Sequence, residues 1–186
     1  MKAIEIVNQL KRSGSKEYQK KYQKFFKMGE GQYSQYDQFI GVRVPSLRKL
    51  SKTCITLSWK ELENLISSPI HEARMLALFI LILKDEKNDD DRVFNFYKKN
   101  IQYVNNWDLV DCSAHKIVGK KLINKNKDQL FKWANSNDLW TRRISMVATW
   151  YFIKNNGPLS PTLKLAKIFL KDPEDLMHKA TGWMLR

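Results

Sequence analysis

The sequence predicts an all-α protein in which helical hairpins stack into a curved α-solenoid. Apolar residues recur at helical spacing along the 186 residues, and no stretch shows the alternation of a β-strand. Successive helices also start at comparable positions, namely His71, Trp107, Trp140 and Met177, which lie 36, 33 and 37 residues apart. Repeats of this length are typical of hairpins that bury their apolar sides against neighbouring hairpins. We therefore expect a single repeat domain over residues 1–186, with equivalent positions lining a concave groove.

Residues that favour helix starts divide the first half of the chain. Ser15 and Ser58 are suited to cap the helices that follow them, and Pro45 suits a first helical turn. Residues 29–45 show no clear period, and long segments of this kind are often functional or mobile. Asn88–Asp91 lacks the ligand spacing of a calcium loop, so we interpret it as a helix cap. The expected helices cover residues 1–11, 16–28, a stretch opened by Pro45, the stretch from 59 to 66, residues 71–83, and a helix that ends near Lys99.

The second half continues in the same way. Asn105 or Asn106 is expected to cap the helix of Trp107, a turn follows at 124–127, and Asn137-Asp138 precedes the helix of Trp140. Gly157-Pro158 ends that helix. Two further helices are expected, over residues 159–170 and from Pro173 onward, and the chain stops at Arg186 inside the last one. We therefore expect a domain that is truncated at its C-terminus.

The chain is strongly basic. It has 33 Lys and Arg residues against 19 Asp and Glu residues, which gives a formal net charge of +14. Such a domain is usually attracted to a polyanion, although surface lysines can also serve only solubility. Cys54 and Cys112 match no zinc spacing, and no segment resembles a signal peptide or a membrane span. We expect a cytoplasmic protein with reduced cysteines and no membrane partner.

The segment that starts at Trp107 carries the most informative pair of side chains. Trp107 and Asp111 are four residues apart, so they project from the same face of a helix. An aromatic face attracts a cation by about 0.5–2 kcal/mol. A carboxylate about 4 Å from the cation adds on the order of 4 kcal/mol at an effective dielectric near 20. The pair suits a site for a cation, although Trp107 could instead pack between helices.

The repeat places further polar and aromatic residues on neighbouring helices. If the helices of Trp107, Trp140 and Trp183 lie side by side, then Arg143, Trp183 and Arg186 approach Asp111. We expect the Asp111 carboxylate to be open to solvent between two exposed indole rings. The alternative is that an arginine pairs with this carboxylate for structural reasons.

An ordered set of short motifs resembles the bacterial DNA alkylation repair glycosylases built from HEAT-like repeats, the AlkD family. The motifs cover nearly the whole chain: Gly41-Val42-Arg43-Val44-Pro45 with Leu47-Arg48, Asn106-Trp107-Asp108 with Val110-Asp111, Trp140 with Arg143, and Lys179-Ala180 with Gly182-Trp183 and Leu185-Arg186. No single motif is decisive, but their order and spacing together are fairly specific.

The resemblance implies hydrolysis of the N-glycosidic bond of purines alkylated at N3 or N7 in double-stranded DNA. It implies that Asp111 stabilises the sugar cation and orients water, that Trp107 and Trp183 face the deoxyribose, and that Arg143 binds a phosphate. Arg186, Arg43 and Arg48 are further candidates for DNA contacts. No lysine is singled out for Schiff-base chemistry, so the enzyme is expected to be monofunctional. We also expect a monomer that is associated with the nucleoid and needs neither a metal nor another cofactor.

Two other functions fit the same sequence. A non-catalytic binder of bent or branched DNA would show salt-sensitive binding without base release. A helical-repeat scaffold for an acidic protein partner would use the tryptophans as packing residues, and the fold alone does not separate it from an enzyme.

Overall fold

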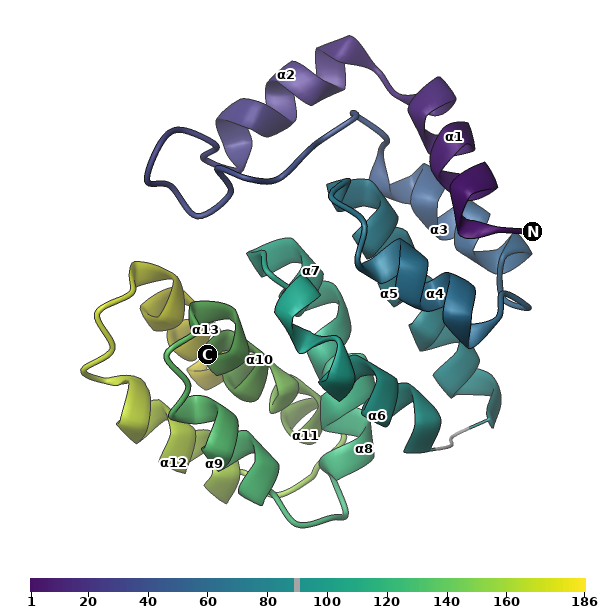
Figure 1. Cartoon of the computed structure of the whole chain (residues 1–186). Helices are drawn as coiled ribbons and strands as arrows, with labels where there is room; N and C mark the ends of the chain where they lie inside the picture. The colour runs from purple at the N-terminus through teal and green to yellow at the C-terminus, as the bar shows by residue number, and fades with distance from the viewer. Residues whose placement is uncertain (89–90) are drawn as a thin grey trace. The chain divides into compact units, whose positions relative to one another are not determined.

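Helices account for the regular secondary structure of residues 1–88 and 91–186, which are the residues that the computed structural model describes (Figure 1). The all-α prediction is confirmed, because these residues contain no named strand and only an isolated bridge between Gln38 and Ile70. The chain forms two compact units that divide between residues 89 and 90. The expected cap at Asn88–Asp91 falls largely outside the described residues. The single-domain expectation, the HEAT-like type of repeat and the curvature of the solenoid stay predictions.

The first unit contains five helices among its described residues, and they follow the predicted starts closely. Ser15 accepts the N–H of Tyr18, and Ser58 accepts the N–H of Glu61, so both predicted caps are confirmed. Their bounds are α1 Ala3–Ser13, α2 Lys16–Phe25, α3 Val44–Thr53, α4 Trp59–Ile66 and α5 His71–Asn88. The apolar helix α5 packs against α3 and α4 and forms the centre of the unit.

The segment without clear period is anchored where it approaches α5. The buried Glu72 carboxylate accepts the backbone N–H groups of Ile40, Gly41 and Val42 at 2.7–3.2 Å. Gly41 has φ +81° there, and a Cβ on it would lie 2.1 Å from the Ser15 carbonyl oxygen. These contacts explain why the segment needs glycine, since a side chain would collide with the start of α2.

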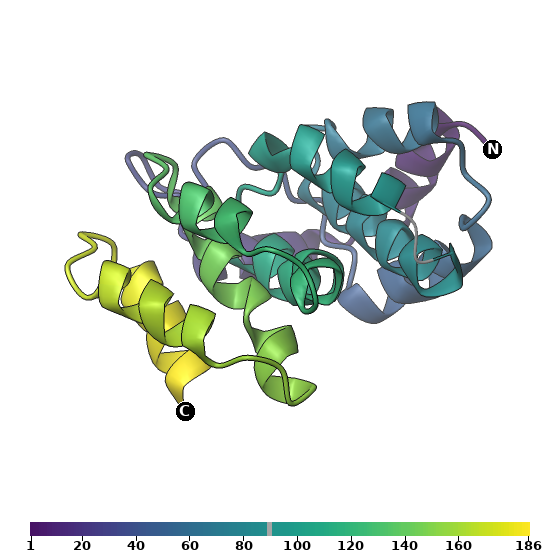
Figure 2. The same ribbon diagram turned by 90° about the horizontal axis from the view of Figure 1, so that it is seen from below.

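The second unit contains the helices of the predicted repeat. Its elements are α6 Asp91–Lys99, a 3₁₀ turn Ile101–Tyr103, α7 Trp107–Ala114, a π-helical segment His115–Gly119, α8 Lys120–Leu122, α9 Asp128–Ala134, α10 Leu139–Ala148, α11 Trp150–Lys154, α12 Ser160–Phe169 and α13 Asp175–Leu185. Helix α10 packs against α7 on one side and against α13 on the other, and α12 packs against α13 (Figures 1 and 2). Three of the four helices that the repeat aligned, α7, α10 and α13, therefore do lie side by side.

In the first unit, α2 ends at Phe25, three residues before the expected end, and α5 continues to Asn88, five residues beyond it. Two local features of the second unit also differ from the sequence expectation. The helix of Trp140 was expected to continue to residue 155, but it is interrupted at Thr149, between α10 and α11. The helix of Trp107 changes to π-helical geometry at residues 115–119, where it meets α10 and α11. A Cβ on Gly119 would lie 2.1 Å from the carbonyl oxygen of Ala148, so the chains approach more closely there than a side chain permits.

Candidate active site in the second unit

The start of α7 is built as its sequence predicts. Asn106 is the N-cap, with its side-chain oxygen accepting the Trp107 N–H at 2.8 Å. Asp108 accepts the N–H of Leu109 in the first turn, where the helix dipole favours a negative charge. Trp107 and Asp111 consequently lie one turn apart on the same face of α7, and both side chains are half-buried.

The far side of α7 is held by buried residues. The Tyr97 hydroxyl on α6 lies 3.1 Å from that of Ser113, which donates to the Leu109 carbonyl oxygen at 2.6 Å. Both Tyr97 and Ser113 are fully buried. Burial raises the pKa of Tyr97 far above its ordinary value, so this hydroxyl stays protonated and serves only as a hydrogen-bonding group. These contacts orient the opposite face of α7, which carries Asp111.

Asp111 is paired with Arg143 of α10. Nε of Arg143 donates to Oδ1 at 3.0 Å and Nη2 donates to Oδ2 at 2.8 Å, a bidentate arrangement that fixes the carboxylate plane. Nη1 of Arg143 donates to the carbonyl oxygen of Leu176 in the first turn of α13. The guanidinium of Arg143 therefore connects α7, α10 and α13. It does so in the protein interior, since the Arg143 side chain is 6% exposed.

This ion pair corrects two expectations. Asp111 was expected to be open to solvent, and Arg143 was expected to bind a DNA phosphate. The structure instead shows the alternative that the sequence left open, in which the arginine pairs with the carboxylate. The physical reason is that Arg143 faces the packed side of α10 and would be a buried unpaired charge without Asp111.

The carboxylate nevertheless remains partly reachable, because the Asp111 side chain is 21% exposed. Burial raises its pKa, and the hydrogen bonds and charge of Arg143 act in the opposite direction. A carboxylate has about four acceptor positions on its two oxygens, and Arg143 occupies one on each. Asp111 can thus accept further hydrogen bonds from water or a ligand while Arg143 holds it in place.

Trp183 lies beside a second tryptophan, Trp150, which was not among the predicted site residues. Its ring lies 5.6 Å from that of Trp150, with an interplanar angle of 35°. Trp150 follows Arg143 by seven residues and Trp183 follows Leu176 by seven, so both indoles come two turns after the Arg143–Leu176 contact. That spacing is the sequence signal that identifies Trp150. Both tryptophans are half-buried and form one aromatic surface.

The remaining candidate arginines are exposed. Arg186 is the last residue after α13. In the first unit, the guanidinium of Arg43 lies over the ring of Tyr18 at 5.3 Å, and that of Arg48 lies over Phe79 at 4.3 Å. Stacking of this kind holds a planar guanidinium while its N–H groups point sideways, where they can bind an anion.

His115 lies one turn beyond Asp111 and begins the π-helical segment. Burial lowers its pKa to about 4, and the neighbouring Lys116 shifts it in the same direction. The imidazole is therefore neutral at physiological pH. It adds no positive charge beside the carboxylate.

Stacked helical hairpins that bring one carboxylate, one buried arginine and several indoles onto adjacent helices define an all-α helical-repeat protein with a candidate active site. The model of the DNA alkylation repair enzyme family matches residues 6–186, and the chain belongs to this family. Comparison with the curated proteins gave no match. Its function therefore lies in DNA repair, and DNA is its partner. Among the described residues no helix is long and apolar enough to cross a membrane.

Proposed function

We propose that the protein is a monofunctional DNA glycosylase that hydrolyses the N-glycosidic bond of purines alkylated at N3 or N7. The observation that carries the proposal is the partly exposed Asp111 carboxylate, oriented by Arg143 and one helical turn from the Trp107 indole. A carboxylate next to an aromatic face stabilises a cation, and the transition state of this reaction is a sugar cation.

The chemistry suits a base that already carries a positive charge. Bond cleavage between the purine nitrogen and C1′ leaves the bonding electrons on the cationic purine, which departs as a neutral molecule. No general acid is needed, which agrees with a neutral His115 beside the site. Water adds to C1′, and Asp111 accepts its proton through a carboxylate oxygen position that Arg143 does not use. The product is free base and an abasic site.

The ion pair limits how much charge the carboxylate can contribute. An unpaired carboxylate about 4 Å from the sugar cation would contribute on the order of 4 kcal/mol at an effective dielectric near 20. The Arg143 charge opposes part of that attraction, so we assign Asp111 about 2–3 kcal/mol, or roughly 30–150-fold in rate. Trp107 and Trp183 are proposed to add about 1–2 kcal/mol each by facing the deoxyribose. Totals of this size suit a labile cationic base and are too small for an intact purine.

DNA contacts outside the reacting nucleotide are assigned to exposed cations. Arg43, Arg48 and Arg186 are proposed to bind backbone phosphates, in keeping with the net charge of +14. Arg143 is assigned a positioning role instead, because its three donor groups are already engaged in the buried contacts with Asp111 and Leu176.

The second candidate function is that of a DNA-binding protein without catalysis. The Asp111–Arg143 pair favours it, because a neutralised carboxylate is a weaker stabiliser of a cation. Incubation with duplex DNA that contains 7-methylguanine separates the two functions. A glycosylase releases free 7-methylguanine, detectable by mass spectrometry, and leaves DNA that breaks only after alkali treatment. Salt-sensitive binding with no free base would reject the glycosylase proposal in favour of the binding protein.

A further inference from the structure

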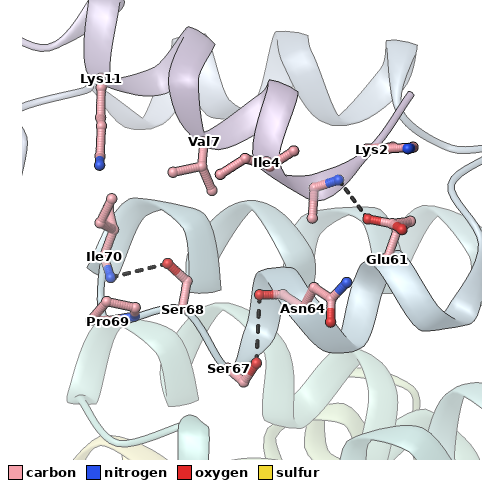
Figure 3. A pocket seen from close by; sticks show the side chains of 11 residues that line it. Lys2, Ile4, Val7, Lys11, Glu61, Asn64, Ser67, Ser68, Pro69 and Ile70 are labelled. Atoms are coloured by element: carbon pink, nitrogen blue, oxygen red, sulfur yellow. Dashed lines mark hydrogen bonds between the residues drawn. The ribbon is translucent and has the colours of Figure 1, made fainter.

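A groove in the first unit lies apart from every residue assigned above. It runs between α1 and the segment from α4 to the start of α5, and it encloses about 550 Å³ (Figure 3). Its apolar surface comes from Ile4 and Val7 on one side and from Pro69 and Ile70 on the other. Ile4 is 61% exposed, so it presents apolar surface to the groove. The volume falls in the range of sites that bind small ligands or peptide side chains.

The two walls of the groove are fixed relative to each other. The backbone N–H of Ala3 at the start of α1 donates to the Glu61 carboxylate of α4 at 2.6 Å. The Ser68 hydroxyl accepts the N–H of Ile70 at 3.2 Å, which shapes the turn opposite α1. A ligand would therefore meet a formed groove and would not have to order its walls, which reduces the cost of binding.

Charge is distributed unevenly along the groove. The Lys11 side chain extends from α1 towards Ile70 and Ser68 (Figure 3). Lys2 and Glu61 lie at the opposite end, where Glu61 is already bonded to Ala3. Lys2 and Lys11 are nine residues apart on α1, or about 14 Å at the rise of an α-helix. The Lys11 end thus offers a cation beside apolar surface with no lining carboxylate of its own.

We propose that this groove binds the acidic C-terminal tail of a partner protein that ends in a large apolar residue. The last side chain packs on Val7, Ile70 and Pro69, and the terminal carboxylate pairs with Lys11. About four extended residues then cover the distance to Lys2, where an acidic side chain finds its counter-ion. A DNA strand fits less well, because apolar side chains separate the two lining lysines and leave the phosphates between them without a cation.

A fluorescein-labelled peptide of sequence Gly-Gly-Asp-Asp-Leu-Phe with a free carboxyl end tests the proposal by fluorescence anisotropy with the full chain. Amidation of that end is expected to weaken binding by about tenfold, and so is Lys11→Gln, which removes the charge from the proposed pair. Ile4→Ser is expected to weaken binding by a similar factor, since it removes exposed apolar surface. Lys60→Gln is the matched control, because Lys60 is an exposed lysine of α4 outside the groove, and it should leave binding unchanged.

Unspecific attraction to a basic protein is the main competing explanation. It predicts that the amidated peptide, and a scrambled peptide with the apolar residues moved inward, bind as tightly as the original peptide. It also predicts equal effects of Lys11→Gln and Lys60→Gln on binding. Either result would overturn the proposal. Thermal melts confirm that each variant is folded. Release of 7-methylguanine should be unchanged in Lys11→Gln, so this test stands apart from that of the glycosylase function.

Discussion

Arg143 on α10 binds the Asp111 carboxylate of α7, while its neighbour Arg142 binds Asp172 at 2.8 and 3.2 Å. Consecutive arginines thus hold carboxylates on two different segments. Both pairs are largely withdrawn from solvent, with Arg142 at 12% and Asp172 at 5% exposure. The two pairs offer a controlled comparison, because only the Asp111 pair belongs to the candidate active site.

We predict that Arg143→Met and Arg142→Met both destabilise the fold, by about 2–4 kcal/mol, because each leaves a buried carboxylate without its partner. Their effects on base release should differ. Arg143→Met frees the carboxylate to rotate and also removes the charge that opposes it. We expect the lost orientation to outweigh the unmasked charge, so the single-turnover rate of the folded protein should fall by about tenfold. Arg142→Met should leave that rate within about twofold of wild type. Urea unfolding and 7-methylguanine release measure the two effects, and equal rates in the two variants would refute a positioning role for Arg143.

A second prediction concerns the glycine at the π-helical segment. Gly119→Ala places a Cβ 2.1 Å from the Ala148 carbonyl oxygen and 2.6 Å from the Tyr151 Cβ. Because α10 or α11 would have to move, we expect a loss of about 2–3 kcal/mol in the free energy of unfolding. Gly182→Ala is the control, since a Cβ there meets no atom within 4 Å. It should stabilise α13 by about 0.5–1 kcal/mol in urea unfolding. Equal effects of both substitutions would contradict the close approach.

The variant Trp107→Ala distinguishes a glycosylase from a helical-repeat scaffold for a protein partner. Trp107 is half-buried at the first position of α7, whereas Trp140 is only 7% exposed in the core. We expect Trp107→Ala to remain folded with a modest fall in Tm and to lose about tenfold in base release, since only the aromatic face is missing. Trp140→Ala should lower stability by about 3–5 kcal/mol. If Trp107→Ala unfolds as readily as Trp140→Ala, Trp107 is a packing residue and the scaffold gains support.

His115 makes stability depend on pH in a defined direction. Burial lowers its pKa to about 4 in the folded protein, so between the ordinary histidine pKa and pH 4 the unfolded chain binds a proton that the folded chain does not. Stability should therefore fall as pH falls through this window, by about 1–2 kcal/mol after allowance for partial exposure. Thermal melts of His115→Gln should show a flatter profile than wild type. Identical profiles for His115→Gln and the wild type would show that His115 has no such effect.

Local chemistry made much of the fold predictable. Each predicted helix cap accepts a backbone N–H of the helix that follows it, as seen at Ser15, Ser58, Asn106 and Asp138. A short polar side chain at this position satisfies an N–H group that has no partner within the helix. The repeat of helix starts correctly placed α7, α10 and α13 next to one another. These features depend on neighbouring residues and on a regular period, both of which are visible in the chain.

The missed features depend on contacts between distant residues. Asp111 and Arg143 are 32 residues apart, and nothing local distinguishes an arginine that pairs with a carboxylate from one that binds a phosphate. The burial that decides between them arises only when α10 packs between α7 and α13. The π-helical segment at 115–119 likewise reflects the close approach of Gly119 to Ala148, and helical periodicity does not record it.

The charge of Asp111 is the central claim of the proposed mechanism, and Asp111→Asn tests it most directly. Asparagine keeps the size of the side chain and one acceptor for Arg143 but removes the negative charge. Single-turnover release of 7-methylguanine from duplex DNA should fall by on the order of 100-fold relative to wild type, while DNA binding changes little. Tm should fall, because the buried Arg143 loses its counter-charge, so the rate is measured at a temperature at which thermal melts show the variant folded. Release at the wild-type rate by Asp111→Asn would contradict the account, because the sugar cation would then be stabilised by another group.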